Sequence, residues 1–333
     1  MNFRSIWDLQ QTIVRVSPLI KQFDLIVGVP RSGILAASLL SLSTNKPLAD
    51  LSGFVDGRML ATGRTKSADK LLRTMKDVRT VLVLDDSIAN GFAMTEARER
   101  TKHLTDHFDI SYAAVYGERR SHAETDFVFE VVSQPRVFQW NFMHHDLLDR
   151  ACVDIDGVLC PDPTPVENDD GARYETFLRE TGTLHIPTRR IGHLVTNRLE
   201  KYRAPTEAWL RAQGIEYGHL HMNDAATVTE RRAQPVGAFK AQIYRKIGGS
   251  LFIESEVDQA EAIAAQTGRP VLCTESWRIH LGDGAAALAF QGMSTLSHGT
   301  QTLKKRAKIT AKRLVRSVVG QGGLDRIKSL ARR

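Results

Sequence analysis

Cysteine is scarce in this 333-residue chain, and long apolar runs are missing from it. The three cysteines, Cys152, Cys160 and Cys273, have no metal-type spacing and are too few for a disulfide framework, so we expect reduced thiols. No run approaches the ~18 apolar residues of a transmembrane helix. Met1–Leu19 also lacks the continuous apolar stretch of a signal peptide. These absences argue against a secreted, disulfide-stabilised domain and against a membrane-spanning protein, and they predict a cytoplasmic location.

Acidic residues are nearly missing from the last part of the sequence. Residues 304–333 contain eleven Lys or Arg and one acid, Asp325, whereas the other 303 residues contain 34 basic and 37 acidic side chains. Within the tail, 296–333, apolar side chains recur at helical spacing, at Leu303, Ala307, Ala311, Leu314 and Val318. We therefore expect a basic amphipathic helix that binds anionic lipids at the inner face of the cytoplasmic membrane. Packing on the protein itself or on a second subunit is the main alternative, and nucleic acid is disfavoured because no aromatic residue is interleaved.

The rest of the sequence alternates short apolar segments with helical patterns. This alternation predicts an α/β fold with two doubly wound parallel sheets. We expect one domain over 1–145, a second over 146–295 and the tail over 296–333. The expected strands are Asp24–Val29, Val81–Leu84, Ser111–Val115, Phe127–Val132, Cys152–Ile155, Ile191–Thr196, Tyr217–Met222, Leu251–Glu254 and Val271–Cys273. The expected helices are Ile34–Leu42, Met94–Leu104, Tyr202–Gln213, Ala238–Ile247 and Glu256–Thr267, and Gly53–Thr74 is read either as a mobile loop over an active site or as a solvated connector.

A first candidate site follows two of the expected strands. Val29–Gly33 is a Gly/Pro turn between a strand and a helix, where backbone amides, an arginine and a serine could hold a pyrophosphate. About fifty residues later, Val81–Ala93 carries the pair Asp85-Asp86 after an apolar run and then a turn of small residues. Two carboxylates beside a phosphate-binding turn suggest contacts to ribose hydroxyls and a Mg²⁺ ion bridged by pyrophosphate. The alternative is that the acidic pair only caps a helix.

These segments resemble the type I phosphoribosyltransferase family, whose signature has four apolar positions, two acids and a phosphate loop. The resemblance covers about 20–135 and implies a site for phosphoribosyl pyrophosphate (PRPP). The implied contacts are Val29, Pro30, Arg31, Ser32 and Gly33 to pyrophosphate, Asp85 and Asp86 to ribose, and Ser87, Ala89, Asn90 and Gly91 to the 5-phosphate. The pattern departs from the family at Ala89, where members that use nucleobases often carry a catalytic acid, and at Asn90 and Ala93, where hydroxyls are usual. The departures favour an acceptor other than a nucleobase.

A second candidate site opens with Asp154-Ile-Asp156-Gly157 at the end of an expected strand. Alternation along a strand directs both carboxylates to one side. Three further polar features follow in order: Thr196 near a strand end, Lys240 near the start of a helix, and the acids Glu254 and Asp258 four residues apart. Any one of these could be structural, but their order at strand and helix ends favours a phosphate site.

This series resembles the haloacid dehalogenase-like (HAD) phosphatases over about 150–275. The resemblance implies that Asp154 attacks phosphorus, and that Asp156 acts as general acid and base, a role that requires a raised pKa. Thr196 would hold the phosphoryl group and Lys240 would balance its charge. The implied Mg²⁺ ligands are Asp154, Asp156, Glu254 and Asp258, with Glu256 as a competing candidate. Pro161–Arg190 would form a modest cap or loop insertion.

The two resemblances together are similar to bifunctional proteins that install ribofuranose in bacterial surface polysaccharides such as capsule and O-antigen. They imply transfer of phosphoribosyl from PRPP to a hydroxyl of a glycan acceptor, which is expected to be lipid-linked, and then removal of the 5-phosphate. Two alternatives stay open: a nucleobase phosphoribosyltransferase fused to a 5′-nucleotidase, and a domain that senses ribosyl phosphates attached to a phosphatase.

Overall fold

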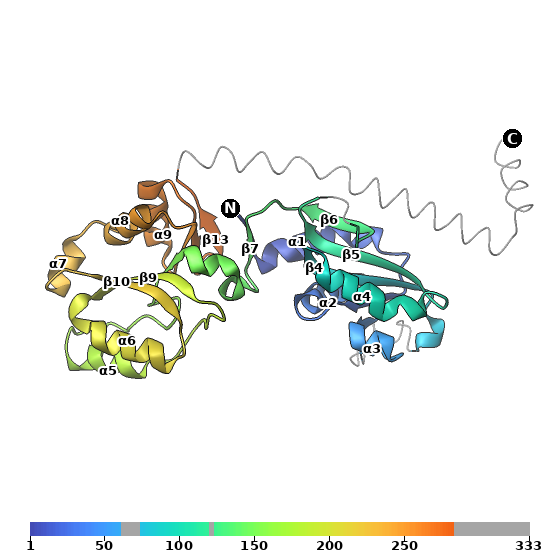
Figure 1. The fold of residues 1–333 in the computed structure, drawn as a ribbon, viewed down its shortest axis with the longest axis horizontal. Helices are drawn as coiled ribbons and strands as arrows, with labels where there is room; N and C mark the ends of the chain where they lie inside the picture. Colours follow the sequence, from blue (N-terminus) through green and yellow to red (C-terminus); the bar gives the residue numbers. More distant parts are fainter. Residues whose placement is uncertain (61–73, 120–122, 283–333) are drawn as a thin grey trace, which may run out of the picture. The chain divides into compact units, whose positions relative to one another are not determined.

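The computed structural model describes residues 1–60, 74–119 and 123–282. The predicted helix of the tail, at 296–333, and the predicted loop residues 61–73 lie outside this part of the chain. The described residues form two compact units, essentially 6–136 and 137–282, which are described one at a time (Figure 1). A two-stranded sheet of β1 (Asn2–Arg4) and β7 (Arg136–Phe138) lies where the chain passes from one unit to the other.

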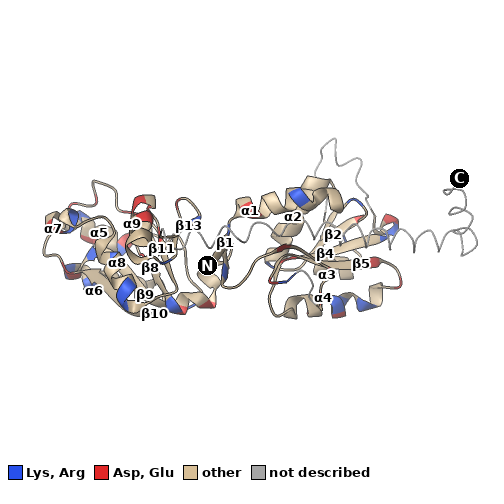
Figure 2. Cartoon of the chain, turned by 90° about the horizontal axis from the view of Figure 1, so that it is seen from above, with Lys and Arg blue, Asp and Glu red and all other residues tan. Residues whose placement is uncertain are grey.

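The first unit contains a five-stranded sheet in the order β3-β2-β4-β5-β6, with every neighbouring pair parallel. Its strands are β2 (Leu25–Gly28), β3 (Leu48–Asp50), β4 (Thr80–Ile88), β5 (Asp109–Gly117) and β6 (Phe127–Val131). Its helices are α1 (Ile6–Val16), α2 (Ser32–Thr44), α3 (Leu51–Val55) and α4 (Phe92–Thr101). Figures 1 and 2 show α1 and α2 on one side of the strands and α4 on the other. Helices on both faces explain why the central strands are continuous apolar runs.

The strand order of the first unit reverses between β2 and β4. From β2 the chain passes to β3 on one side, and then returns to β4 on the other side. The connections after β2 and β4 therefore diverge, and in open α/β sheets ligands bind outside the carboxyl ends of strands placed in this way. β2 stops at Gly28, which pairs with Leu84, whereas β4 continues beside β5 as far as Ile88. The Asp85-Asp86 pair thus lies just past the end of β2.

The second unit contains a six-stranded sheet in the order β10-β9-β8-β11-β12-β13, which is parallel except for the last pair. Its strands are β8 (Ala151–Val153), β9 (Ile191–Leu199), β10 (Tyr217–Asn223), β11 (Leu251–Glu254), β12 (Val271–Cys273) and β13 (Arg278–His280). Its helices are α5 (Ala172–Glu180), α6 (Arg203–Ala212), α7 (Val228–Ala233), α8 (Ala238–Ile247) and α9 (Val257–Thr267). Figure 1 shows α8 and α9 on one face of the sheet and α5 and α6 on the other. The order reverses between β8 and β11, so a ligand site is expected there as well.

The predicted fold class, α/β with parallel sheets, is confirmed. β11, β12 and α8 have the bounds that the sequence predicted. Eight helices and strands of the described residues were not predicted: β1, α1, β3, α3, β7, α5, α7 and β13. The start of the predicted Gly53–Thr74 loop is helical instead, because the Asp50 side chain accepts a hydrogen bond from Gly53 N (2.9 Å) and caps α3. Within the described residues no helix is both long and apolar enough to cross a membrane.

Candidate active sites

The first site lies at the reversal point of the first sheet. The turn after β2 and the end of β4 meet there through a hydrogen bond from Ser32 Oγ to Asp86 Oδ1 (2.7 Å). Asp86 is buried, with 3% of its surface exposed, and Asp85 is buried beside it. Arg31 is exposed at the same turn, and the peptide bond between Pro30 and Arg31 is cis. The structure therefore brings together the two segments that the sequence singled out.

Gly33 makes this close approach possible. A Cβ atom at this position would lie 2.8 Å from Asp85 Oδ1 and 2.9 Å from the carbonyl oxygen of Leu84. Contacts this short involve backbone, so a larger residue would push the turn and the acidic pair apart. Gly33 is also the second residue of α2, which places a helix N-terminus beside the turn. An anion held by the turn would accordingly sit at the positive end of a helix and next to two carboxylates.

In the first site, the pKa of Asp85 is strongly raised. Burial, followed by repulsion from Asp86, raises the pKa of Asp85 to about 8. Among the described residues, Asp85 has no ion pair, and its Oδ1 accepts the backbone N–H of Asp86 (2.8 Å). A buried carboxylate such as Asp85, with no ion pair among the described residues, favours a ligand that donates hydroxyl hydrogens or brings a cation.

The predicted phosphate loop has two parts in the structure. Ser87 is still within β4, whereas Ala89 and Asn90 are exposed and Gly91 precedes α4 in a left-handed conformation. The buried guanidinium of Arg136 lies beneath the start of this loop, where Nη2 donates to the carbonyl oxygen of Ile88 (2.6 Å). Sequence reasoning missed Arg136, because nothing in the sequence links it to a residue 48 positions earlier.

The second site lies at the reversal point of the second sheet and is built on a buried ion pair. Lys240 Nζ, from α8, lies 2.6 Å from Asp154 Oδ2 and 2.8 Å from Glu254 Oε2. All three side chains are at most 6% exposed. Asp154 follows β8 directly and Glu254 ends β11, so the two strands that flank the reversal point each supply one carboxylate. This is the grouping that the sequence predicted for these residues.

Charge within this trio is unbalanced. Burial raises the pKa of Asp154 well above its ordinary range, and Lys240 opposes that shift. Burial also opposes the charge of Lys240, but the two carboxylates raise its pKa overall. When both carboxylates are ionised, one negative charge is left over in a water-poor environment, which favours an additional cation.

The described residues contain no cluster of three or more His, Cys, Asp or Glu side chains arranged to hold a metal ion. The surplus negative charge and the oxygen donors nevertheless fit Mg²⁺, which is usually bound by one or two carboxylates together with substrate phosphate. The predicted ligands Asp154, Asp156 and Glu254 do not form such a cluster, so Mg²⁺ at these residues stays a prediction. When bound, Mg²⁺ would neutralise charge on a phosphoryl group.

Asp156 is tied to an arginine that the sequence analysis did not identify. Arg198 Nη2 donates to Asp156 Oδ1 (2.7 Å) and Nε contacts both carboxylate oxygens (3.1 and 3.2 Å). Arg198 has no exposed surface; burial opposes its charge, but Asp156 raises its pKa overall. Arg198 is the last but one residue of β9, and its partner lies 42 positions earlier in the sequence, so only the folded sheet reveals the pair.

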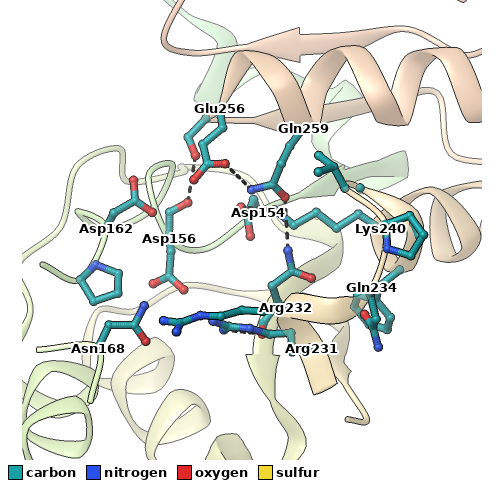
Figure 3. A pocket seen from close by; sticks show the side chains of 18 of the residues that line it. Asp154, Asp156, Asp162, Asn168, Arg231, Arg232, Gln234, Lys240, Glu256 and Gln259 are labelled. Carbon is teal, nitrogen blue, oxygen red and sulfur yellow. Dashed lines mark hydrogen bonds and ion pairs between the residues drawn. The ribbon is translucent and has the colours of Figure 1, made fainter. Parts of the chain in front are cut away.

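A cavity of about 360 Å³ opens above these groups. Figure 3 shows Asp154 and Asp156 at one side, Lys240 at another, and Arg231 and Arg232 across from the two carboxylates. The residues that line it are Asp154, Asp156, Asp162, Pro163, Asn168, Tyr174, Asn197, Arg231, Arg232, Gln234, Pro235, Val236, Gly237, Ala238, Phe239, Lys240, Ser255, Glu256 and Gln259. Its volume is within the range typical of small-molecule sites.

Three predicted site residues do not reach the cavity lining. Glu254 is fully buried and contacts Lys240 instead. Thr196 is fully buried, and its hydroxyl accepts the backbone N–H of Arg198 (3.2 Å). Asp258 is exposed in the first turn of α9, because the helical turn directs Gln259 and the preceding Glu256 to the cavity instead. Glu256 was the competing candidate in the sequence, and it is the one of the two acids that lines the site.

Comparisons with known proteins give weak likenesses to solved structures. Comparison with protein-family models and with curated protein sequences gave no match. A Helicobacter pylori xanthine-guanine-hypoxanthine phosphoribosyltransferase is 13% identical, covering 42% of this chain and 92% of its own, with a TM-score of 0.32. A purine phosphoribosyltransferase from Pyrococcus horikoshii is 19% identical, with the same coverages and a TM-score of 0.30.

A third solved structure, of a Pnkp1/Rnl/Hen1 complex, extends over more of the chain. It is 15% identical and covers 78% of this chain and 98% of its own, with a TM-score of 0.26. Structural neighbours thus include phosphoribosyltransferases over about two-fifths of the chain, but likenesses this distant do not assign an activity.

Proposed function

We propose that the protein transfers a 5-phosphoribosyl group from PRPP to a glycan hydroxyl and then removes the 5-phosphate. The product would be a ribofuranose residue in a bacterial surface polysaccharide. The observation that carries the proposal is the presence, in one chain, of two carboxylate sites, each at the reversal point of its own parallel sheet. A phosphoribosyl site and a phosphate-ester site are chemically consecutive, because the product of the first is a substrate for the second.

The transfer step is assigned to the first unit. Asp85 and Asp86 would accept hydrogen bonds from the ribose hydroxyls, and Mg²⁺ would arrive with PRPP as part of the substrate. The bond between the anomeric carbon and pyrophosphate breaks, and the acceptor oxygen bonds to that carbon. Exposed Arg31 and the amides of the 29–33 turn would stabilise the departing pyrophosphate. The acceptor's proton leaves to solvent or to pyrophosphate.

The acceptor is inferred to be a sugar hydroxyl. Ala89 is exposed at the loop and offers no carboxylate that could assist a nucleobase. A hydroxyl acceptor has no ring nitrogen for such an acid to protonate, so the missing carboxylate is no obstacle to its attack on the anomeric carbon. The basic sequence of 296–333 supports a glycan carried on a lipid at the membrane surface.

The hydrolytic step is assigned to the second unit. Asp154 would attack phosphorus, and the bond between phosphorus and the ribose oxygen would break as that oxygen takes a proton from Asp156 or from a water beside it. Water then releases phosphate from the aspartyl ester. Lys240 keeps Asp154 oriented through its 2.6 Å contact and compensates charge on the phosphoryl oxygens.

The decisive experiment separates the two steps with one substitution. Wild-type protein and Asp154→Asn are incubated with PRPP, Mg²⁺ and a panel of glycans and nucleobases, and products are measured by mass spectrometry. We expect a pentose adduct from wild type, and a phosphorylated pentose adduct that accumulates only with Asp154→Asn, whose phosphatase rate falls by about 10³-fold or more. Pyrophosphate release should be unchanged in that variant. Consumption of a nucleobase without any ribosylated glycan would eliminate the glycan proposal, and release of pyrophosphate by neither protein would leave the first unit a binding domain.

A further inference from the structure

The segment between β10 and α8 is a preformed wall of the second site. Its helix, α7, begins at a capped end where Thr227 Oγ1 accepts the Glu230 N–H (3.2 Å) and Glu230 Oε2 accepts the Ala226 N–H (2.9 Å). Its two flanks are joined where Asn223 Nδ2 donates to Gln234 Oε1 (2.9 Å). Asn223 has no exposed surface, so this clasp is firmly anchored in the sheet. No residue of α7 is fully buried, but Val228 is partly buried against the core and adds to these polar contacts.

Two arginines of this segment line the cavity. Arg231 Nη1 donates to the carbonyl oxygen of Asn197 at the end of β9 (3.1 Å), which fixes its direction. Arg232 is exposed and has no ion pair among the described residues. Figure 3 shows both guanidinium groups extending beneath Asp156 toward Asn168, opposite Glu256 and Gln259.

The carboxylates at the reacting end do not need these arginines as partners. Asp154 and Glu254 are paired with Lys240, and Asp156 is paired with Arg198. Asp162 and Glu256 also line the cavity, but neither forms an ion pair with Arg231 or Arg232 among the described residues, so both guanidinium groups can still bind a ligand. A planar guanidinium with several donors is well suited to bind carboxylate or phosphate.

We propose that Arg231 and Arg232 bind a second anionic group of the substrate, on the leaving-group side of the phosphate ester. The inference rests on the proposed phosphatase activity and narrows its substrate class to pentose 5-phosphates in which the attached residue carries a carboxylate or a further phosphate. A cavity of about 360 Å³ has room for a pentose phosphate with such a neighbour. Neutral glycosides of ribose 5-phosphate would be bound only through their phosphate ester, at Asp154 and Lys240.

The test uses matched substrates that differ in one charge. Hydrolysis is compared for ribofuranosyl 5-phosphate linked to glucose, to glucuronate and to glucose 6-phosphate, with wild type, Arg231→Ala, Arg232→Ala and the double variant. Wild type should prefer both acidic substrates in kcat/KM by roughly tenfold to a hundredfold, and the double variant should lose that preference while retaining the neutral rate. If wild type prefers only the glucuronate compound, the second anion is a carboxylate, and if it prefers only the glucose 6-phosphate compound, the second anion is a phosphate. Arg211→Ala, on α6 and outside the cavity lining, is the matched control and should keep the preference.

Two results would overturn the inference. An equal loss on neutral and acidic substrates would mean that the arginines hold the transferring phosphoryl group itself, and no loss on either would mean that they bind nothing. Failure of the phosphatase proposal is recognised separately, by the absence of hydrolysis of every substrate by wild type with Mg²⁺. In that case calorimetric binding of the same three compounds to wild type and to the double variant still decides whether the arginines select a second anion.

Discussion

The two units place carboxylates at equivalent positions but compensate their charge in different ways. In the second unit, buried Lys240 and Arg198 pair with the acids inside the protein. In the first unit, Asp85 lacks an ion pair among the described residues, and its pKa is raised to about 8. Under the proposed function, the second site would be organised before substrate arrives, whereas the first site would be completed by the cation and hydroxyls that a ligand brings.

The largest effect is expected from a substitution that removes the buried countercharge of the second site. Lys240→Met would leave Asp154 and Glu254 facing each other in a buried environment with no countercharge. We expect the free energy of unfolding of the second unit to fall by about 3–5 kcal/mol, and phosphatase activity to be lost. Urea denaturation followed by circular dichroism measures the first effect and phosphate release the second.

The control is Lys246→Met, which removes an exposed lysine from the same helix. It should change stability by less than about 0.5 kcal/mol. Equal losses in the two variants would show that the buried pair contributes nothing particular, and the contrast between the two units would then be wrong.

An intermediate effect concerns the close approach in the first unit. Gly33→Ala places a Cβ atom 2.8 Å from Asp85 Oδ1, so the turn and the end of β4 must separate. Overpacking of this kind costs about 1–3 kcal/mol, and we expect the affinity for PRPP to fall by roughly tenfold or more. Titration calorimetry measures it, and phosphate-ester hydrolysis by the second unit should be unaffected.

Gly182→Ala is the matched glycine control, because no atom lies within 4 Å of a Cβ built there. It should leave both activities at the wild-type level. A Gly33→Ala protein that binds PRPP normally would show that the turn and the acidic pair do not form one site.

The smallest effect is the dependence of ligand binding on pH. In the ligand-free protein, Asp85 keeps its proton below about pH 8, because burial and repulsion from Asp86 raise the pKa of Asp85 to about 8. A ligand that brings Mg²⁺ favours the ionised pair, so binding should release up to one proton and the affinity should rise from pH 6 to pH 8 and then level off. Calorimetry of PRPP with Mg²⁺ in buffers of different ionisation enthalpy measures the released proton.

PRPP itself also ionises, and Asp85→Asn is the control for that contribution. This variant should lose most of the dependence of PRPP affinity on pH. The pH dependence of the free energy of unfolding should also be opposite to that produced by a salt-bridged acid, which stabilises a protein as the pH rises. Since the folded pKa is raised, the ligand-free first unit should lose stability as the pH rises from about 4 to about 8. Affinity that is constant or falls between pH 6 and pH 8 would contradict the assignment.

Sequence patterns predicted the strand ends well and the partners of the site residues poorly. Apolar runs ending in acids or glycine identified Asp85, Asp154 and Glu254, because the ends of parallel strands meet at one edge of a sheet. Arg136 and Arg198 escaped notice because their partners lie 48 and 42 positions away. The short polar helix α7 has no buried residue and therefore no apolar period to find.

The Asn223–Gln234 clasp closes a loop of ten intervening residues. Changes of length or sequence inside such a loop cost little chain entropy, provided that the contacts of Ala225 and Val228 with the core are kept. Under the proposed phosphatase activity, exchange of this loop, arginines included, would change which phosphate esters the cavity accepts while Asp154, Lys240 and Glu254 stay in place.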